Sequence, residues 1–256
     1  MVVEGFVYVV ADRPGPMAGA GVGERVRIPS WAPPWIVVDH RLDRVLAGRW
    51  PGRLFRVRSV PPESDEERDA LARAARNLGA DAGYTRVSAV DVLEELRPGL
   101  LFGPHGDAVV DVLEHARLLT EPAARALAAA RPPGADDAYD RAWRRWLDAQ
   151  AGGAAYQDDD HRGVLAIPGV GPGRSPIGSG LVAVWTCVVD SARRRVGPAA
   201  FTVQTDDGEE DEVLLDPWRT AGGALLDAAL ALGAPDLVDA ADAAVLTAAW
   251  RAVDRP

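Results

Sequence analysis

One turn in the sequence places a histidine and an aspartate where they could do chemistry together. In the segment Phe102-Gly-Pro-His105-Gly-Asp107, the histidine lies between a proline and a glycine, just before an apolar pattern typical of a helix. Free N–H groups at a helix start can hold an anion, and His105 with Asp107 could form an acid/base pair there. The alternative, which we favour because helix caps are far commoner than active sites, is that Asp107 caps the helix and His105 is an exposed loop residue.

A second candidate pair follows the apolar run at residues 36–38. Asp39, His40 and Asp43 leave the end of an expected strand, where such side chains could bind a divalent metal or act as acid and base. The spacing matches no metal signature. We therefore favour the interpretation that Asp39 caps a helical turn at 41–47 and that His40 is exposed, and we predict neither a metal nor a cofactor.

Three tryptophans near the N-terminus are candidates for partner binding. Trp31, Trp35 and Trp50 lie among prolines, glycines and arginines, one of which is Arg53. Tryptophan and arginine are enriched at the centres of protein interfaces, so exposed side chains here would indicate a protein or peptide partner. If the tryptophans are buried, they anchor loops instead. In a later loop, Arg174 could bind an anion, although we favour a simple connector because a strand pattern follows it.

Other charged runs have simpler interpretations. Residues 158–161 and 206–212 are rich in acidic residues, and we expect both runs to be solvated. The same expectation holds for Arg193, Arg194 and Arg195, which we place in a hairpin turn. Cys187 falls within an apolar run and is expected to be a buried, inert thiol.

The composition excludes several classes of enzyme. None of the 256 residues is lysine, so Schiff-base lysines and the lysines of phosphate-binding P-loops and protein kinases are ruled out. We attribute this absence to a GC-rich genome rather than to selection for arginine. The net charge of −10 argues against broad nucleic-acid binding, which needs a basic surface, and against docking on anionic membranes.

The sequence also bears on location. It contains one cysteine, so no internal disulfide can form. No apolar run approaches the roughly 20 residues that span a bilayer, and the first residues lack the features of a signal peptide. We expect a cytoplasmic protein without a membrane partner; the sequence leaves its oligomeric state open.

Hydrophobic periodicity predicts an α+β fold of short, mostly antiparallel strands with helices packed on one face. A composition break at 148–163 predicts two subdomains, residues 1–150 with strands followed by three helices, and residues 151–256 with a central apolar hairpin followed by two helices. The expected N-terminal strands lie at about 5–10, 36–38, 54–58 and 84–90, and the helices at about 65–78, 107–119, 121–130 and 136–149. In the C-terminal part we expect strands at 164–167, 181–189, 201–204 and 213–215, and helices at about 216–232 and 245–253.

Two functions remain open from the sequence. The first is a non-catalytic accessory or protein-binding protein, because the chain lacks an obvious catalytic constellation. The second is an enzyme that acts on a small anionic substrate, with His105 as acid/base, Asp39 or His40 nearby, and Arg174 or Arg53 holding the anion. The second requires these residues to converge in space.

Overall fold

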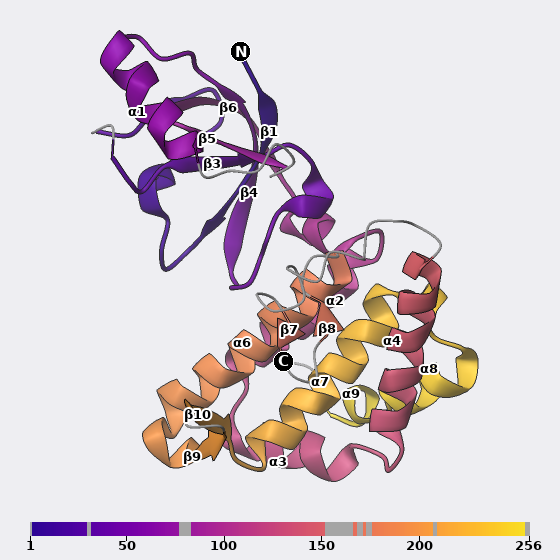
Figure 1. The fold of residues 1–256 in the computed structure, drawn as a ribbon. Coiled ribbons are helices and arrows are strands. Elements are labelled where there is room, and N and C mark those ends of the chain that lie inside the picture. Colours follow the sequence, from indigo (N-terminus) through magenta and orange to yellow (C-terminus); the bar gives the residue numbers. More distant parts are fainter. Residues whose placement is uncertain are drawn as a thin grey trace. The chain divides into compact units, whose positions relative to one another are not determined.

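The chain forms two compact units, Met1–Leu101 and Phe102–Pro256, as seen in a computed structural model (Figure 1). The structure describes residues 2–29, 32–76, 83–151, 166–167, 171–172, 176–206 and 209–253. The boundary lies next to Phe102 rather than near residue 150, where the composition break placed it. The physical reason is that the helices after residue 105 bury their apolar faces against helices of the C-terminal part.

The first unit is built on a six-stranded sheet in which all neighbouring strands are antiparallel. Across the sheet the strands are β2 (Arg25–Arg27), β6 (Ala89–Leu96), β4 (Gly52–Ser59), β1 (Glu4–Val10), β3 (Ile36–Asp39) and β5 (Tyr84–Val87). One helix, α1 (Asp65–Ala75), contacts β5. It begins at the predicted cap, since Ser64 Oγ accepts a hydrogen bond from the backbone N–H of Glu67 at 3.1 Å.

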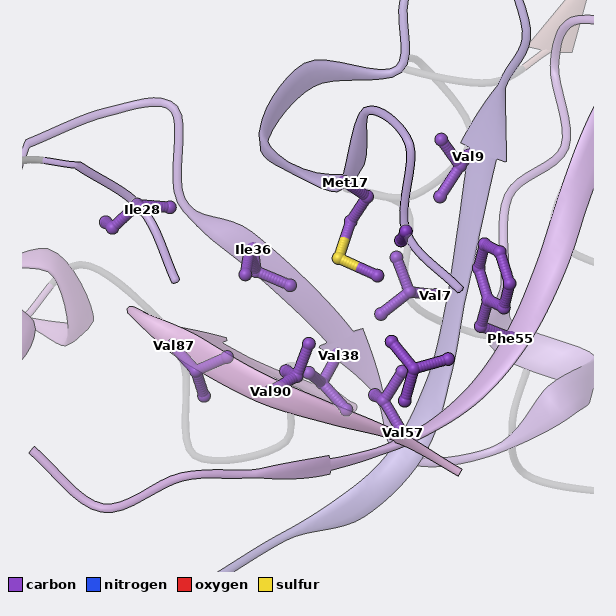
Figure 2. Packing of buried hydrophobic residues seen from close by; sticks show 12 residues of the cluster. Val7, Val9, Met17, Ile28, Ile36, Val38, Phe55, Val57, Val87 and Val90 are labelled. Atoms are coloured by element: carbon purple, nitrogen blue, oxygen red, sulfur yellow. The ribbon is translucent and has the colours of Figure 1, made fainter. Parts of the chain in front are cut away.

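The two faces of this sheet differ in chemistry. One face carries the buried aliphatic core, a cluster that includes Val7, Val38 and Val57 from adjacent strands together with Met17 (Figure 2). The opposite face carries ion pairs between neighbouring strands, such as Arg58 with Glu4. The predicted alternation holds at the end of β4, where exposed Arg56 and Arg58 flank the buried Val57. Arg56 and Arg58 are paired with Glu94 and Glu4 on the wet face of the sheet, whereas Arg53 lies on the side of Phe55.

The second unit is mainly helical. Its helices are α2 (Gly106–Leu118), α3 (Glu121–Ala130), α4 (Ala135–Ala151), α6 (Pro176–Arg195), α7 (Trp218–Gly233), α8 (Ala240–Leu246) and α9 (Ala248–Ala252). Helix α7 is buried along most of its length and contacts α2, α3 and α6 (Figure 1). The second unit also has 3-10 helices at Gly197–Ala200 and Pro235–Leu237, and two short paired strands, β7 (Ala166–Ile167) and β8 (Gly171–Pro172). Further 3-10 helices lie at Gly15–Met17 and Leu42–Arg44 in the first unit, and at Pro98–Phe102 where the two units join in the sequence.

Helix α6 corrects the strand predicted at 181–189. Apolar residues on both faces of a strand and on a buried helix give the same short-range pattern, and the run is rich in valine, which favours strands. The buried positions in fact recur at helical spacing, as in Leu181, Val184 and Val188. The predicted central hairpin of the C-terminal part is therefore absent from this segment, and the three arginines at 193–195 form the last turn of α6.

A smaller hairpin is present where the sequence predicted a turn. Strand β9 (Phe201–Asp206) pairs with β10 (Glu209–Leu214) in antiparallel register, with Thr202 opposite Val213. The α+β class is thus confirmed, although the helices of the second unit pack mainly on one another. Among the described residues, no helix combines the length and the apolar character needed to cross a membrane.

Candidate functional site

The residues proposed for acid/base chemistry are divided between the two units. Asp39 and His40 belong to the first unit, whereas His105 and Asp107 belong to the second, so neither unit holds the whole set. Asp39 is half-buried at the end of β3, and burial raises the pKa of its carboxyl to about 7. The exposed His40 lies with Nε2 2.7 Å from Thr85 Oγ1. Asp39 does not cap the short helix at Leu42–Arg44, whose N-cap is Arg41.

His105 lies at the N-cap of α2, with its side chain exposed and making no capping hydrogen bond. Asp107 lies in the first turn rather than at the cap, where its negative charge is favourable near the positive end of the helix dipole. The cap expected at Asp107 is therefore displaced by two residues. In the part of the chain that the structure describes, no three His, Cys, Asp or Glu side chains are grouped to hold a metal ion.

The predicted binding residues differ in burial and in their partners. Trp35 and Trp50 are half-buried, and Trp35 packs against the core of the first unit. Arg53 already has partners within the first unit. It forms a bidentate ion pair with Glu95, at 2.8 and 2.7 Å, and its guanidinium carbon lies 4.7 Å from the centre of the Phe55 ring. Trp31, Arg174 and residues 158–161 lie outside the described residues.

Two arginines at the end of α6 form hydrogen bonds with the backbone of α2. Arg194 donates to the carbonyl of Arg117 at 3.1 Å, and Arg195 donates to the carbonyl of Leu118 at 3.2 Å. These carbonyls lie at the C-terminal end of α2, where unpaired acceptors and the helix dipole favour a cation. All three arginines are exposed, as expected, and Arg194 and Arg195 also cap the end of α2.

The second unit contains a pocket of about 710 Å³, a size typical of ligand sites. Its walls come from the start of α4 and the residues before it, from α6, from β10 and from one face of α7. The lining residues are Arg131, Asp136, Tyr139, Trp185, Asp211, Glu212, Val213, Leu214, Arg219, Thr220, Gly223, Leu226 and Asp227. None of the residues singled out from the sequence for acid/base chemistry is among them.

Two adjacent glycines of α7 allow large side chains to lie against this helix. A Cβ atom at Gly222 would lie 2.7 Å from the Trp185 ring, and one at Gly223 would lie 3.0 Å from the Arg131 guanidinium carbon. Glycine inside a helix is less stable than alanine by about 0.5–1 kcal/mol. Close approach of an aromatic ring and a guanidinium group therefore explains why glycine fits at both positions.

A buried ion pair closes one side of the pocket. Arg131 Nε donates to Asp227 Oδ2 at 2.7 Å, and one of its terminal nitrogens donates to Asp136 at 2.6 Å. Asp227 is only 3% exposed. Its burial raises the pKa of this carboxyl to about 6, and the hydrogen bonds from Arg131 oppose that rise. Burial also raises the pKa of Tyr139, which is neutral at physiological pH.

The pocket carries an excess of negative charge. Its lining includes four carboxylates and two guanidinium groups. At its rim, Arg193 pairs with Glu212, and Asp216 pairs with Arg219. Counting these partners, the described residues place five carboxylates against three guanidinium groups, an excess of two negative charges. The half-buried Trp185 adds an aromatic surface, on which cations also bind favourably.

No protein-family model, curated protein or solved structure matches the chain.

The sequence reasoning missed this pocket because its residues are far apart in the chain. The available signal lay in the helix at 218–233, where Gly222, Gly223 and Asp227 interrupt an otherwise apolar pattern. Residues three and four apart share one helix face, so Gly223 and Asp227 could have been placed together. Their partners Arg131 and Trp185 carried no recognisable spacing.

Proposed function

We propose that this protein is a non-catalytic binding protein that receives a cationic group, carried by a protein or peptide partner, in the pocket of its second unit. The observation that carries the proposal is the excess of negative charge in an open pocket that also contains apolar and aromatic surface. Complementary charge favours association and selects the partner. A cytoplasmic location, expected from the sequence, is part of the same proposal.

The carboxylates differ in their availability to a ligand. Asp227 is buried and bonded to Arg131, so it forms part of the wall. Asp211 and Glu212 are exposed on β10, and the side chain of Asp136 is 86% exposed. An incoming ammonium or guanidinium group can therefore reach carboxylates without breaking the buried pair.

The alternative of an enzyme for a small anionic substrate has less support. Both arginines that line the pocket already bind carboxylates, Arg131 with Asp227 and Arg219 with Asp216. An anion would have to displace these partners and enter a negative field. His105 does not line this pocket. A binding function consequently requires fewer rearrangements than the catalytic one.

Calorimetric titration of the full chain with agmatine, a small guanidinium compound, tests the proposal. We expect saturable binding that weakens with added NaCl, because salt screens exposed charges. Neutralising two carboxylates by Asp211→Asn and Glu212→Gln is expected to weaken binding by about 3- to 10-fold, given the modest strength of exposed ion pairs.

The matched control neutralises two exposed carboxylates of α1, through Glu66→Gln and Asp69→Asn. This variant has the same net charge as the pocket variant but is expected to bind agmatine as the native protein does. Succinate serves as the anionic probe. Binding of succinate without binding of agmatine, or an equal loss in both variants, would overturn the proposal.

A further inference from the structure

We propose that the outer edge of β10 binds an extended basic segment of a partner protein by strand addition, with a basic side chain of that segment in the pocket. This inference rests on the proposed function and names the form of the ligand. In strand addition, main-chain hydrogen bonds to a sheet edge supply affinity, and pockets for alternate side chains supply specificity.

The hydrogen-bonding register shows which backbone groups of β10 face outward. Leu215 N donates to Ala200 O at 2.8 Å, immediately beyond the paired strands. In an antiparallel ladder, every second residue pair exchanges hydrogen bonds. Asp211 and Val213 therefore point their N–H and C=O groups toward β9, whereas those of Glu212 and Leu214 point away from it.

Among the described residues, no strand pairs with this outer edge. The sheet of β9 and β10 has two strands, and within the described chain no further backbone hydrogen bond involves Glu212 or Leu214. A two-stranded hairpin is marginally stable by itself. A third strand would add hydrogen bonds to the outward groups of Glu212, which is exposed, whereas Leu214 is buried.

The pocket runs along this edge. Four consecutive residues of β10, Asp211 to Leu214, line it. Since successive side chains of a strand point to opposite faces, a pocket on one face would contact only alternate residues. Contact with four in a row places the pocket beside the backbone, and the facing wall includes Thr220 and Gly223 of α7 together with Arg131.

Charge complementarity determines the kind of segment. Asp211 and Glu212 are exposed acidic residues of β10, and the pocket has the excess negative charge described above. The half-buried Val213 offers an apolar contact toward the other end of the strand. The segment that fits is an extended stretch in which basic residues alternate with β-branched apolar residues.

The test uses the full chain and a fluorescein-labelled peptide, Val-Arg-Val-Arg-Val, with binding measured by anisotropy. Two isomers carry two backbone N-methyl groups each, one on both arginines and the other on the second and third valines. Both keep the charge and the side chains. In strand addition only alternate peptide N–H groups face the edge, so we expect one isomer to lose at least tenfold in affinity and the other to bind like the parent.

Proline substitutions test which edge is used. Glu212→Pro removes an outward N–H without breaking the ladder to β9, a change that edge strands tolerate. We expect it to lower the affinity for the peptide more than Glu212→Gln does. Val203 lies opposite Glu212 and is 57% exposed on the other edge. Val203→Pro is the matched control and is expected to leave affinity unchanged within about twofold, because the peptide binds elsewhere.

The outcomes separate this inference from the proposed function. Strand addition is overturned if both N-methyl isomers bind like the parent, or if Val203→Pro weakens binding as much as Glu212→Pro. Continued binding of agmatine in that case leaves the cation pocket standing. If neither agmatine nor the peptide binds the native chain, both proposals fail together.

Discussion

Arg131 and Asp227 are 96 residues apart in the sequence, yet Arg131 Nε donates to Asp227 Oδ2 at 2.7 Å in the wall of the pocket. The guanidinium group lies over Gly223, one helical turn before Asp227. This pair joins the segment before α4 to the buried helix α7. The position of the pocket wall therefore depends on a charge interaction that is largely shielded from water.

Removing the carboxylate of this pair is expected to destabilise the second unit. Asp227→Ala leaves Arg131 largely buried without its main partner, and loss of one member of a buried pair typically costs about 3–5 kcal/mol. Asp136→Ala removes the exposed partner of the same arginine and should cost less than about 1 kcal/mol. Urea unfolding followed by circular dichroism measures both. Equal losses of unfolding free energy would show that the buried contact stabilises the protein no more than the exposed one.

The close approach of Trp185 to α7 predicts an unusual response to alanine. Gly222→Ala improves helix propensity by about 0.5–1 kcal/mol, but the new methyl group would overlap the ring, and overpacking of this kind costs about 1–3 kcal/mol. We expect net destabilisation in the native chain. In a Trp185→Ala background the same change should stabilise the protein. Destabilisation of similar size in both backgrounds, measured by urea unfolding, would contradict this packing.

His115 predicts loss of stability in mild acid. It is 7% exposed, its ring nitrogens have no hydrogen-bond partner among the described residues, and it packs edge-on against Trp250. Burial lowers the pKa of His115 below 6.5. The unfolded chain therefore binds the proton first, and this contribution to stability declines as the pH falls below about 6.5.

Comparison with His115→Phe isolates that contribution, because phenylalanine keeps a ring beside Trp250. The difference in unfolding free energy between native and variant chains should become less favourable to the native chain from pH 7.5 to pH 5. His40→Gln, at an exposed position, is the control and should show a smaller change. A pH-independent difference for His115→Phe would refute the assignment.

We expect Asp39 to affect the pH dependence of stability in the opposite direction. Burial raises the pKa of this carboxyl to about 7, so the folded chain holds a proton that the unfolded chain has already released. Its contribution to stability is present below about pH 4 and is lost as the pH rises through 7. Asp39→Asn should therefore gain stability relative to the native chain between pH 4 and pH 8. Chemical denaturation at both values measures this gain, and its absence would place the carboxyl in contact with water.

Local signals in the sequence predicted several elements correctly. Ser64 and Glu67 marked the start of α1, and the turn at 206–208 marked the β9–β10 hairpin. In each case the residues that determine the structure are close together in the chain. Helix α6 was missed because an apolar run on all sides does not distinguish a buried helix from a central strand.

The site was harder to predict for a physical reason. Its walls join residues from 131 to 227, and their association depends on helix packing rather than on any short motif. The division between the two units, after Leu101, was not visible in the sequence for the same reason, because the burial of α2 against α6 and α7 is a tertiary contact. The candidate residues Asp39, His40, His105 and Asp107 were chosen by residue type, and type alone does not show convergence.

The most direct test of the cation pocket is nuclear magnetic resonance of the Trp185 indole N–H during titration with agmatine. The signal is assigned by its loss in Trp185→Phe. We predict a progressive, saturable shift of this signal, and no comparable shift of the Trp35 or Trp50 indole signals in the first unit. A shift confined to Trp35 and Trp50, or no shift of the Trp185 signal at saturating agmatine, would contradict a cation pocket in the second unit.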